Sequence, residues 1–155
     1  MDMFKTFYIA HKDQLFGYLL RKTGDYDLAA DIVQESFTRY LELYVDKGDN
    51  APLLFTISRN LVLDNVRKNK KHVAYEDDEH GQTIDQEHYY QVREDARLVF
   101  AALQQLGDEE RDILALLACS GLSYREIASV TGNSEANIKV KIHRARVKLK
   151  QTLKG

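Results

Sequence analysis

Apolar residues recur every three or four positions over most of the chain, which is the spacing of helices with one buried face. The stripe Phe4, Tyr8, Leu15 and Leu19 illustrates the pattern. The stripes predict helices over about residues 2–22, 26–46, 51–71, 92–105 and 113–119. Asp25 or Asp27 is expected to cap the second helix, and Asp108 the fifth. No segment alternates as a β-strand does, so we expect an all-α fold.

The last part of the chain predicts a helix-turn-helix. Residues 122–128 form a short apolar-periodic segment, and Gly132 marks a turn. Ser123 and Ser134 are natural N-caps, and Glu126 completes a capping box with Ser123. Residues 134–155 then contain seven Lys or Arg and one acid, and their apolar stripe is Ile138, Ile142, Ala145 and Leu149. A helix with an apolar underside and a cationic outer face suits the major groove of DNA.

Composition narrows the class of protein. The single cysteine, Cys119, excludes an intramolecular disulfide and fits a reducing compartment. There is no apolar run of about 20 residues, and the first residues lack the layout of a signal peptide. We therefore expect a cytoplasmic protein without membrane insertion. We find no arrangement of nucleophile, general base or phosphate-binding loop, so an enzyme is not expected, and neither is a cofactor.

An acidic segment divides the chain. The net charge is only −2, but residues 76–96 carry eight acids and one Arg. We predict a domain over residues 1–73, an acidic linker over 74–90, and a four-helix domain with the helix-turn-helix over 91–155. The acids and histidines of 76–88 suit a solvated linker better than a metal site, so no metal is expected. A second hypothesis is that this segment mimics DNA and docks on basic surfaces.

Four segments carry a resemblance to a known family. Residues 29–37 (AADIVQESF) and 55–67 (FTISRNLVLDNVR) lie in the first half, and residues 122–128 (LSYREIA) and 138–149 (IKVKIHRARVKL) in the second. The chain resembles the extracytoplasmic-function (ECF, group 4) RNA polymerase sigma factors of the sigma-70 family over nearly its whole length. A helix-turn-helix alone is a weak signal. Two distinct halves in this order are a strong one.

The resemblance implies an alternative sigma factor that binds core RNA polymerase and directs promoter recognition, DNA opening and transcription initiation. The first domain (region 2) would bind the polymerase and the melted −10 element. The second domain (region 4) would read the double-stranded −35 element. Since the chain ends at Gly155 without an extension, we expect no sensing domain of its own, and control by a separate anti-sigma factor.

The resemblance also implies roles for residues of the first half. Asp31, Gln34 and Glu35 would contact the polymerase, although their spacing also suits a plain solvated face. The −10 contacts would come from one helix face, through Asn60, Asp64, Arg67, Lys68 and Lys71. Asn60 would read a flipped base beside the loop 45–51, or it merely faces solvent. Asp64 would either accept from a base or, as we prefer, hold a neighbouring Arg.

The −35 contacts would come mainly from the last helix. Its first two turns should lie deepest in the groove, which favours base contacts by Asn137, Lys139, Val140, His143 and Arg144. Phosphate contacts are expected from Arg125, Lys141, Arg146 and Lys148. We interpret His143 as a DNA contact rather than a pH switch or a metal ligand.

Four positions of the helix-turn-helix depart from the family pattern. Thr131 and Asn133 stand where aliphatic residues are usual, so either the turn packs less tightly or both side chains bond the backbone. Asn133 also tolerates a positive φ. Val140 and Lys141 stand where Ser and Arg are commoner, and Val140 can meet only a thymine methyl, which predicts a different promoter preference.

Two other classes of function remain open on the residues alone. An autonomous helix-turn-helix regulator would need a dimer interface or ligand pocket in the first half, where the chain instead has the basic run 67–71. A protein-interaction module, sequestered by a partner, would have no need of the intact basic helix.

Overall fold

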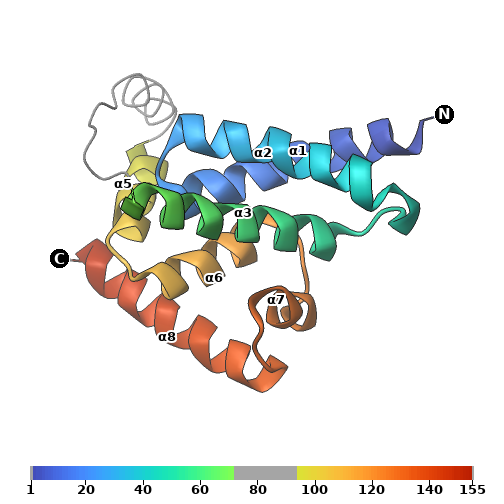
Figure 1. Ribbon diagram of the computed structural model, residues 1–155. Helices are drawn as coiled ribbons and strands as arrows, with labels where there is room; N and C mark the ends of the chain where they lie inside the picture. Colours follow the sequence, from blue (N-terminus) through green and yellow to red (C-terminus); the bar gives the residue numbers. More distant parts are fainter. Residues whose placement is uncertain (1, 72–93, 155) are drawn as a thin grey trace.

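The structure, a computed structural model, describes residues 2–71 and 94–154, and of residues 69–71 it describes the backbone only. In this part of the chain the secondary structure is helical, without strands, which confirms the all-α prediction (Figure 1). The helices are α1 (Met3–Thr23), α2 (Tyr26–Leu43), the 3₁₀ turn η1 (Val45–Lys47), α3 (Ala51–Lys71), α5 (Glu94–Gln104), α6 (Asp108–Cys119), α7 (Tyr124–Thr131) and α8 (Glu135–Lys154).

Side chains that satisfy the first backbone N–H groups define where the early helices begin. Asp25 accepts from Leu28 N over 3.0 Å and caps α2, as predicted. Asn50 accepts from Leu53 N over 3.1 Å at the start of α3, and Pro52 follows in the first turn, where its missing N–H is not needed. Three of the predicted helices thus begin within a residue or two of the sequence-based positions.

Two predicted helix termini were wrong, namely the N-cap of α6 and the C-terminal end of α2. Gly107, not Asp108, is the N-cap of α6, since Glu110 reaches back and accepts from Gly107 N over 3.0 Å. The second helix ends at Leu43, and a 3₁₀ turn replaces its last turn. The Tyr40 hydroxyl donates to Gly48 O and accepts from Asn50 N over 3.2 Å, so the chain is drawn back across the end of α2.

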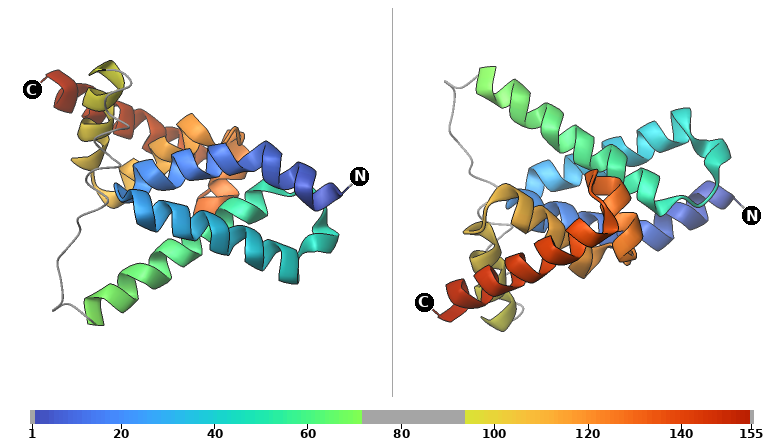
Figure 2. Two further views of the ribbon diagram at one scale, coloured as in Figure 1. Left: turned by 90° about the horizontal axis from the view of Figure 1, so that it is seen from above. Right: turned by 90° about the horizontal axis from the view of Figure 1, so that it is seen from below.

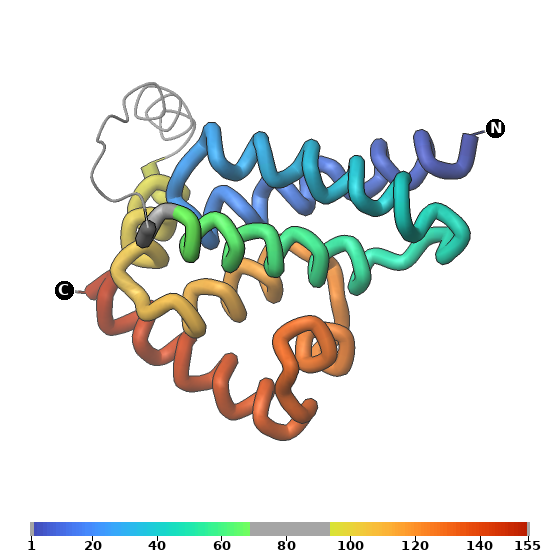
Figure 3. The backbone as a smooth tube through the Cα atoms, viewed as in Figure 1, coloured from blue at the N-terminus to red at the C-terminus, as the bar shows by residue number. Residues whose placement is uncertain are grey.

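The two halves of the chain, residues 2–71 and 94–154, pack directly on one another. Helix α6 lies against α1, and α7 lies against α3 (Figures 1 and 3). The two further views show α8 on the outer side of the C-terminal half, with the chain ends at opposite ends of the molecule (Figure 2). One buried cluster contains residues of both halves, among them Leu15, Phe55, Leu116 and Ile127. The boundaries predicted near 73 and 90, and the acidic linker, lie outside the described residues.

Candidate nucleic-acid interface

The helix-turn-helix has the local structure that its sequence predicts. Ser123 Oγ accepts from Glu126 N over 3.1 Å and Glu126 Oε1 accepts from Ser123 N over 2.9 Å, so the capping box is confirmed. Ser134 Oγ accepts from Asn137 N over 3.1 Å and caps α8. Gly132 ends α7 with a φ of 75°, a left-handed conformation that costs glycine little. The turn between the two helices is thus fixed by caps on both sides.

Asn133 has a different role from the one suggested by its tolerance of positive φ. Among the described residues only glycines have a positive φ, so that suggestion was wrong. Asn133 instead donates to Thr131 Oγ1 over 2.8 Å, and Thr131 Oγ1 donates to Ile127 O over 2.8 Å. Asn133 Oδ1 also accepts from Lys141 Nζ over 2.9 Å. The polar pair therefore connects the turn to the second turn of α8.

Helix α8 has the two faces that its sequence predicts. Ile138, Ile142 and Ala145 are buried, and Leu149 is half-buried, packed against Leu103, Leu106 and Leu114 of the same half. All the predicted −35 residues except the half-buried Lys141 are exposed: Arg125, Asn137, Lys139, Val140, His143, Arg144, Arg146 and Lys148. The structure therefore brings Arg125 of α7 and seven residues of α8 to the exterior of one helix-turn-helix.

Two cations of α8 already have acidic partners. Lys141 Nζ lies 2.6 Å from Glu109 Oε2, and Lys148 Nζ lies 2.6 Å from Glu110 Oε2. The hydrogen bond from Lys148 lowers the pKa of Glu110. Both acids lie in the first turn of α6, where negative charge also interacts favourably with the helix dipole. Sequence reasoning missed these partners because they are 32 and 38 residues away along the chain.

The predicted −10 residues lie along α3. Asn60, Asp64, Arg67 and Lys68 are exposed, whereas the side chain of Lys71 lies outside the described part. Asp64 Oδ1 is 3.4 Å from Arg67 Nη1, so these two exposed side chains are in contact one helical turn apart. The geometry is that of a solvated helix face with an amide near its middle and cations toward its end.

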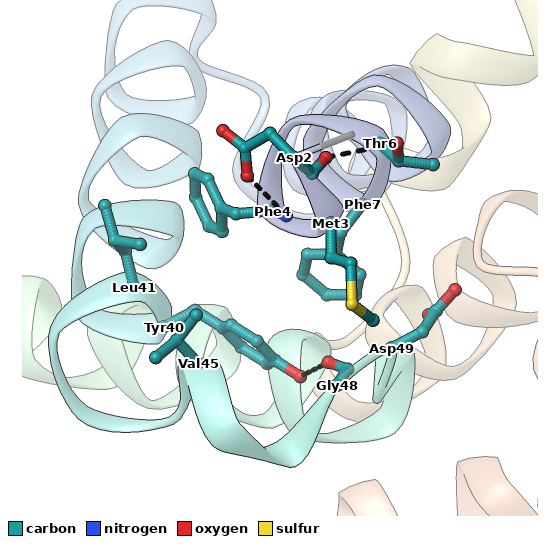
Figure 4. A pocket seen from close by; sticks show the side chains of 10 residues that line it. All are labelled: Asp2, Met3, Phe4, Thr6, Phe7, Tyr40, Leu41, Val45, Gly48 and Asp49. Carbon is teal, nitrogen blue, oxygen red and sulfur yellow. Dashed lines mark hydrogen bonds between the residues drawn. The ribbon is translucent and has the colours of Figure 1, made fainter.

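The loop after α2 borders a cavity of about 410 Å³ (Figure 4). Phe4, Phe7 and Tyr40 supply aromatic walls, and Val45 and Leu41 add aliphatic ones. The residues that line the cavity come from the start of α1, the end of α2 and the loop, and Asn60 is not one of them. The apolar cavity thus faces α1 rather than the exposed amide of α3.

The predicted polymerase contacts form the outer side of α2. Asp31, Gln34 and Glu35 are all exposed, while Ile32 and Val33 beside them are buried. Glu35 Oε2 accepts from Arg39 Nε over 3.1 Å, one helical turn away. The three side chains are therefore accessible on one helix face.

Arg59, beside Asn60, points the other way and was missed by sequence reasoning. Its Nε donates to Asp112 Oδ2 over 2.7 Å, and the residue Asp112 is buried. Tyr18 donates to Asp112 Oδ1 over 2.5 Å, and Lys22 Nζ lies 3.1 Å from the same atom. No sequence signal links these residues, because they come from three helices.

Neither a metal-binding group nor a membrane-spanning helix is found among the described residues. No group of three His, Cys, Asp or Glu side chains is arranged to hold a metal ion there. The acidic and histidine-rich run that raised the question of a metal lies outside this part. Within the same residues, no helix has the length and apolar character needed to cross a membrane.

A capped helix-turn-helix with an exposed cationic helix defines a DNA-binding protein. Comparison with known proteins is more specific. Residues 7–72 match the family described as "Sigma-70 region 2", and residues 96–149 match "Sigma-70, region 4". The ECF RNA polymerase sigma factor SigM of Bacillus subtilis (strain 168) is 35% identical over 148 residues, which cover 92% of this chain and 90% of that protein. The sigma factor EcfG of Rhodopseudomonas palustris (strain TIE-1) is 34% identical, with coverages of 94% and 82%.

Solved structures agree with this assignment. The sigma factor RpoE of Bartonella quintana, in complex with the anti-sigma factor NepR, matches with a TM-score of 0.77 and 25% identity over 97% of this chain and 96% of that one. CnrH, in complex with the cytosolic domain of CnrY, matches with a TM-score of 0.68, also at 25% identity, with coverages of 97% and 87%. The chain belongs to the ECF sigma factor family, whose members recognise promoters and initiate transcription.

Proposed function

We propose that this sigma factor binds core RNA polymerase, reads the −35 element with α8 and the −10 element with α3, and helps to open the DNA between them. The observation that carries the proposal is that both helices expose most of their predicted DNA-contacting side chains, in a chain that matches both sigma regions. The protein would act as a regulatory subunit in the cytoplasm, and the chemistry would remain with the polymerase.

At the −35 element, α8 would enter the major groove. Arg144 and Lys139 can donate to guanine O6 and N7, and a good bidentate pair discriminates by roughly 1–3 kcal/mol. Lys141 and Lys148 would exchange Glu109 and Glu110 for phosphate oxygens. Because that exchange replaces one anion by another, these two lysines should contribute less to net affinity than cations without an acidic partner.

At the −10 element, Asn60 would read an unstacked base and Lys68 would contact phosphate. An amide has both donors and acceptors, so it can bind a base edge once the base has left the stack. Unstacking costs a few kcal/mol, and contacts on the protein must recover it. Asp64 would orient Arg67 toward the DNA, which their 3.4 Å contact supports.

Protein partners would bind elsewhere on the N-terminal half and across both halves. Asp31, Gln34 and Glu35 would contact the polymerase, where charge-assisted hydrogen bonds to Arg are available to the two carboxylates. Both solved relatives are in complexes, and the partner of RpoE is the anti-sigma factor NepR. We infer that this chain is likewise controlled by an anti-sigma factor.

Run-off transcription on a pool of genomic promoter fragments tests the proposal. Discrete new transcripts should appear only when core polymerase and this protein are both present, and their start sites should share −35 and −10 sequences. Specific DNA binding by the protein alone, without transcripts, would instead support an autonomous regulator. As a residue-level control, Asn60→Ala should reduce transcription while duplex binding to the −35 element stays unchanged.

A further inference from the structure

The contact between the two halves contains a buried ionic cluster. Asp112 of α6, in the C-terminal half, accepts from Tyr18 and Lys22 of α1 and from Arg59 of α3. The side chain of Asp112 is 3% exposed, while those of Lys22 and Arg59 are 14% and 27% exposed. These four residues are called the Asp112 cluster. Its carboxylate belongs to one half of the chain and its three donors belong to the other.

Polar side chains of the C-terminal half also cap the C-terminal end of α1, by donating hydrogen bonds to its last carbonyl groups. Gln104 Nε2 donates to Arg21 O over 2.8 Å, and Arg111 Nε donates to Lys22 O over 2.9 Å. The last carbonyls of a helix have no partner within it, and a cation there also interacts favourably with the helix dipole. The ionic cluster and the two caps therefore act on the same junction, that of α1 with α5 and α6.

In this closed arrangement the two helices that would contact DNA are too close together to reach both promoter elements at once. The −10 and −35 elements are centred about 25 base pairs apart, which is about 80 Å along straight B-form DNA. A compact chain of this length has an expected radius of gyration of about 15 Å. Helix α3, which would read −10, is packed against α7 of the helix-turn-helix that would read −35. Both elements can be bound at once only if the halves separate.

We propose that the Asp112 cluster is an interdomain lock that holds the sigma factor closed until polymerase and promoter separate its halves. The proposal rests on the proposed function, because it uses the positions of the two promoter elements. If one partner of a buried carboxylate is removed while the carboxylate stays buried, its charge is left without compensation and the closed state is destabilised. When the halves part, water or DNA phosphate can replace the carboxylate at Lys22 and Arg59, and water can solvate Asp112.

The position of the native cysteine allows the lock to be made covalent. A Cβ atom placed on Gly17 of α1 would lie 3.9 Å from Cys119 Cβ and 3.5 Å from Cys119 Sγ of α6. Disulfides join Cβ atoms about 3.8 Å apart. The Gly17→Cys variant should therefore form a disulfide with Cys119, the only native cysteine, across the junction. Gly17→Ala is the matched control, since it adds the Cβ but not the thiol.

The first test is transcription by the oxidised Gly17→Cys protein with core polymerase, after mass spectrometry has confirmed the disulfide. We expect initiation to fall at least about tenfold, to return on reduction, and to be insensitive to oxidant in Gly17→Ala. Binding of a short −35 duplex should persist, because α8 lies on the outer side, and this shows that the oxidised protein is folded. Equal initiation by the oxidised and reduced proteins would overturn the lock. Absence of transcription with wild type as well would instead contradict the proposed function.

The second test assigns the lock to Asp112. Asp112→Asn keeps the shape of the side chain but removes its charge, and Asp95→Asn, an exposed acid of α5, is the matched control. Small-angle scattering should give a larger radius of gyration for Asp112→Asn than for wild type, and an unchanged one for Asp95→Asn. Asp112→Asn should also associate with core polymerase about tenfold faster than wild type, since a larger fraction of its molecules is open. A radius and an association rate equal to those of wild type would exclude Asp112 as the lock.

Discussion

A buried carboxylate such as that of Asp112 depends on its neighbours to remain ionised. Burial alone would raise the pKa of Asp112, but the charge of Lys22 and the hydrogen bonds from Tyr18 and Arg59 outweigh it and lower the pKa. Burial and the adjacent carboxylate raise the pKa of Tyr18 well above its usual value, so the phenol stays protonated. Asp112 is therefore an ionised carboxylate that accepts from one neutral donor, Tyr18, and from two cationic donors, Lys22 and Arg59.

This balance predicts a pH dependence of stability. A carboxylate with a lowered pKa stabilises the folded state fully above its ordinary pKa of about 4, and that contribution is lost as the pH falls through the lowered value. At pH 7, Asp112→Asn should be less stable by about 2 kcal/mol, the scale of a hydrogen bond to a charged group. Urea unfolding from pH 6 to pH 3 should show the two proteins converging. Parallel curves over this range would contradict the ionised cluster.

The contribution of single cations of α8 to DNA binding should be measurable through the salt dependence of the affinity. Each phosphate contact that is lost reduces the slope of log affinity against log salt by about one unit. Arg144→Ala, Arg146→Ala and Lys139→Ala should reduce the salt slope of promoter binding, whereas Lys5→Ala, on α1, should leave it unchanged. Fluorescence anisotropy with a −35 duplex at several salt concentrations measures the slope. Unaltered slopes for all three would remove α8 as the docking face.

At the scale of elements, short helices depend on their caps. Helix α7 has only eight residues, too few to be stable in isolation, and its capping box satisfies two N–H groups at its start. Its inner side chains, Ile127, Ala128 and Val130, are buried. The orientation of α8 within the helix-turn-helix thus depends on a helix that is stabilised by its cap and by tertiary packing.

Loss of the α7 cap should reduce stability and DNA affinity together. Ser123→Ala should lower the free energy of unfolding by about 1 kcal/mol. Ser129→Ala, at an exposed position inside the same helix, should change it little. Thermal unfolding and −35 duplex binding measure the two effects. Equal stabilities of the two variants would show that the cap contributes nothing.

At the scale of the whole molecule, the two halves share one core. Leu15 and Phe55 of the N-terminal half and Leu116 and Ile127 of the C-terminal half belong to the same buried cluster. Separation of the halves would expose apolar surface as well as the Asp112 cluster. The free protein should therefore behave as one cooperative unit.

Calorimetry tests this cooperativity. Because the core is continuous, the wild-type protein should unfold in a single transition, with a calorimetric enthalpy equal to the van't Hoff enthalpy. Two resolved transitions would show that the halves fold independently and that their contact is weak. Oxidised Gly17→Cys should also unfold in one transition, at a higher temperature than its reduced form, because the cross-link constrains the unfolded chain.

Local signals in the sequence were sufficient for the helices and for the two faces of α8. Periodic apolar residues and N-caps such as Asp25, Ser123 and Ser134 act within one helical turn, so they can be read without the fold. They failed at two helix termini, at one because a contact eight residues away decides the outcome and at the other because two local caps compete. The hydroxyl of Tyr40 draws the chain back after α2, and the side chain of Glu110, three residues along, makes Gly107 rather than Asp108 the N-cap of α6.

The sequence by itself determined the helix pattern and the helix-turn-helix, since each depends on residues close together along the chain, and it indicated the sigma factor family through the order of four segments. Only the tertiary structure decided which charges meet. Asp112 lies 94 residues from Tyr18 and 53 from Arg59, and Lys148 lies 38 residues from Glu110. Asp112 ends the charged run 108–112, and nothing in that run indicates which of its acids is buried or with what it pairs, because burial and pairing arise only when α1, α3 and α6 pack together.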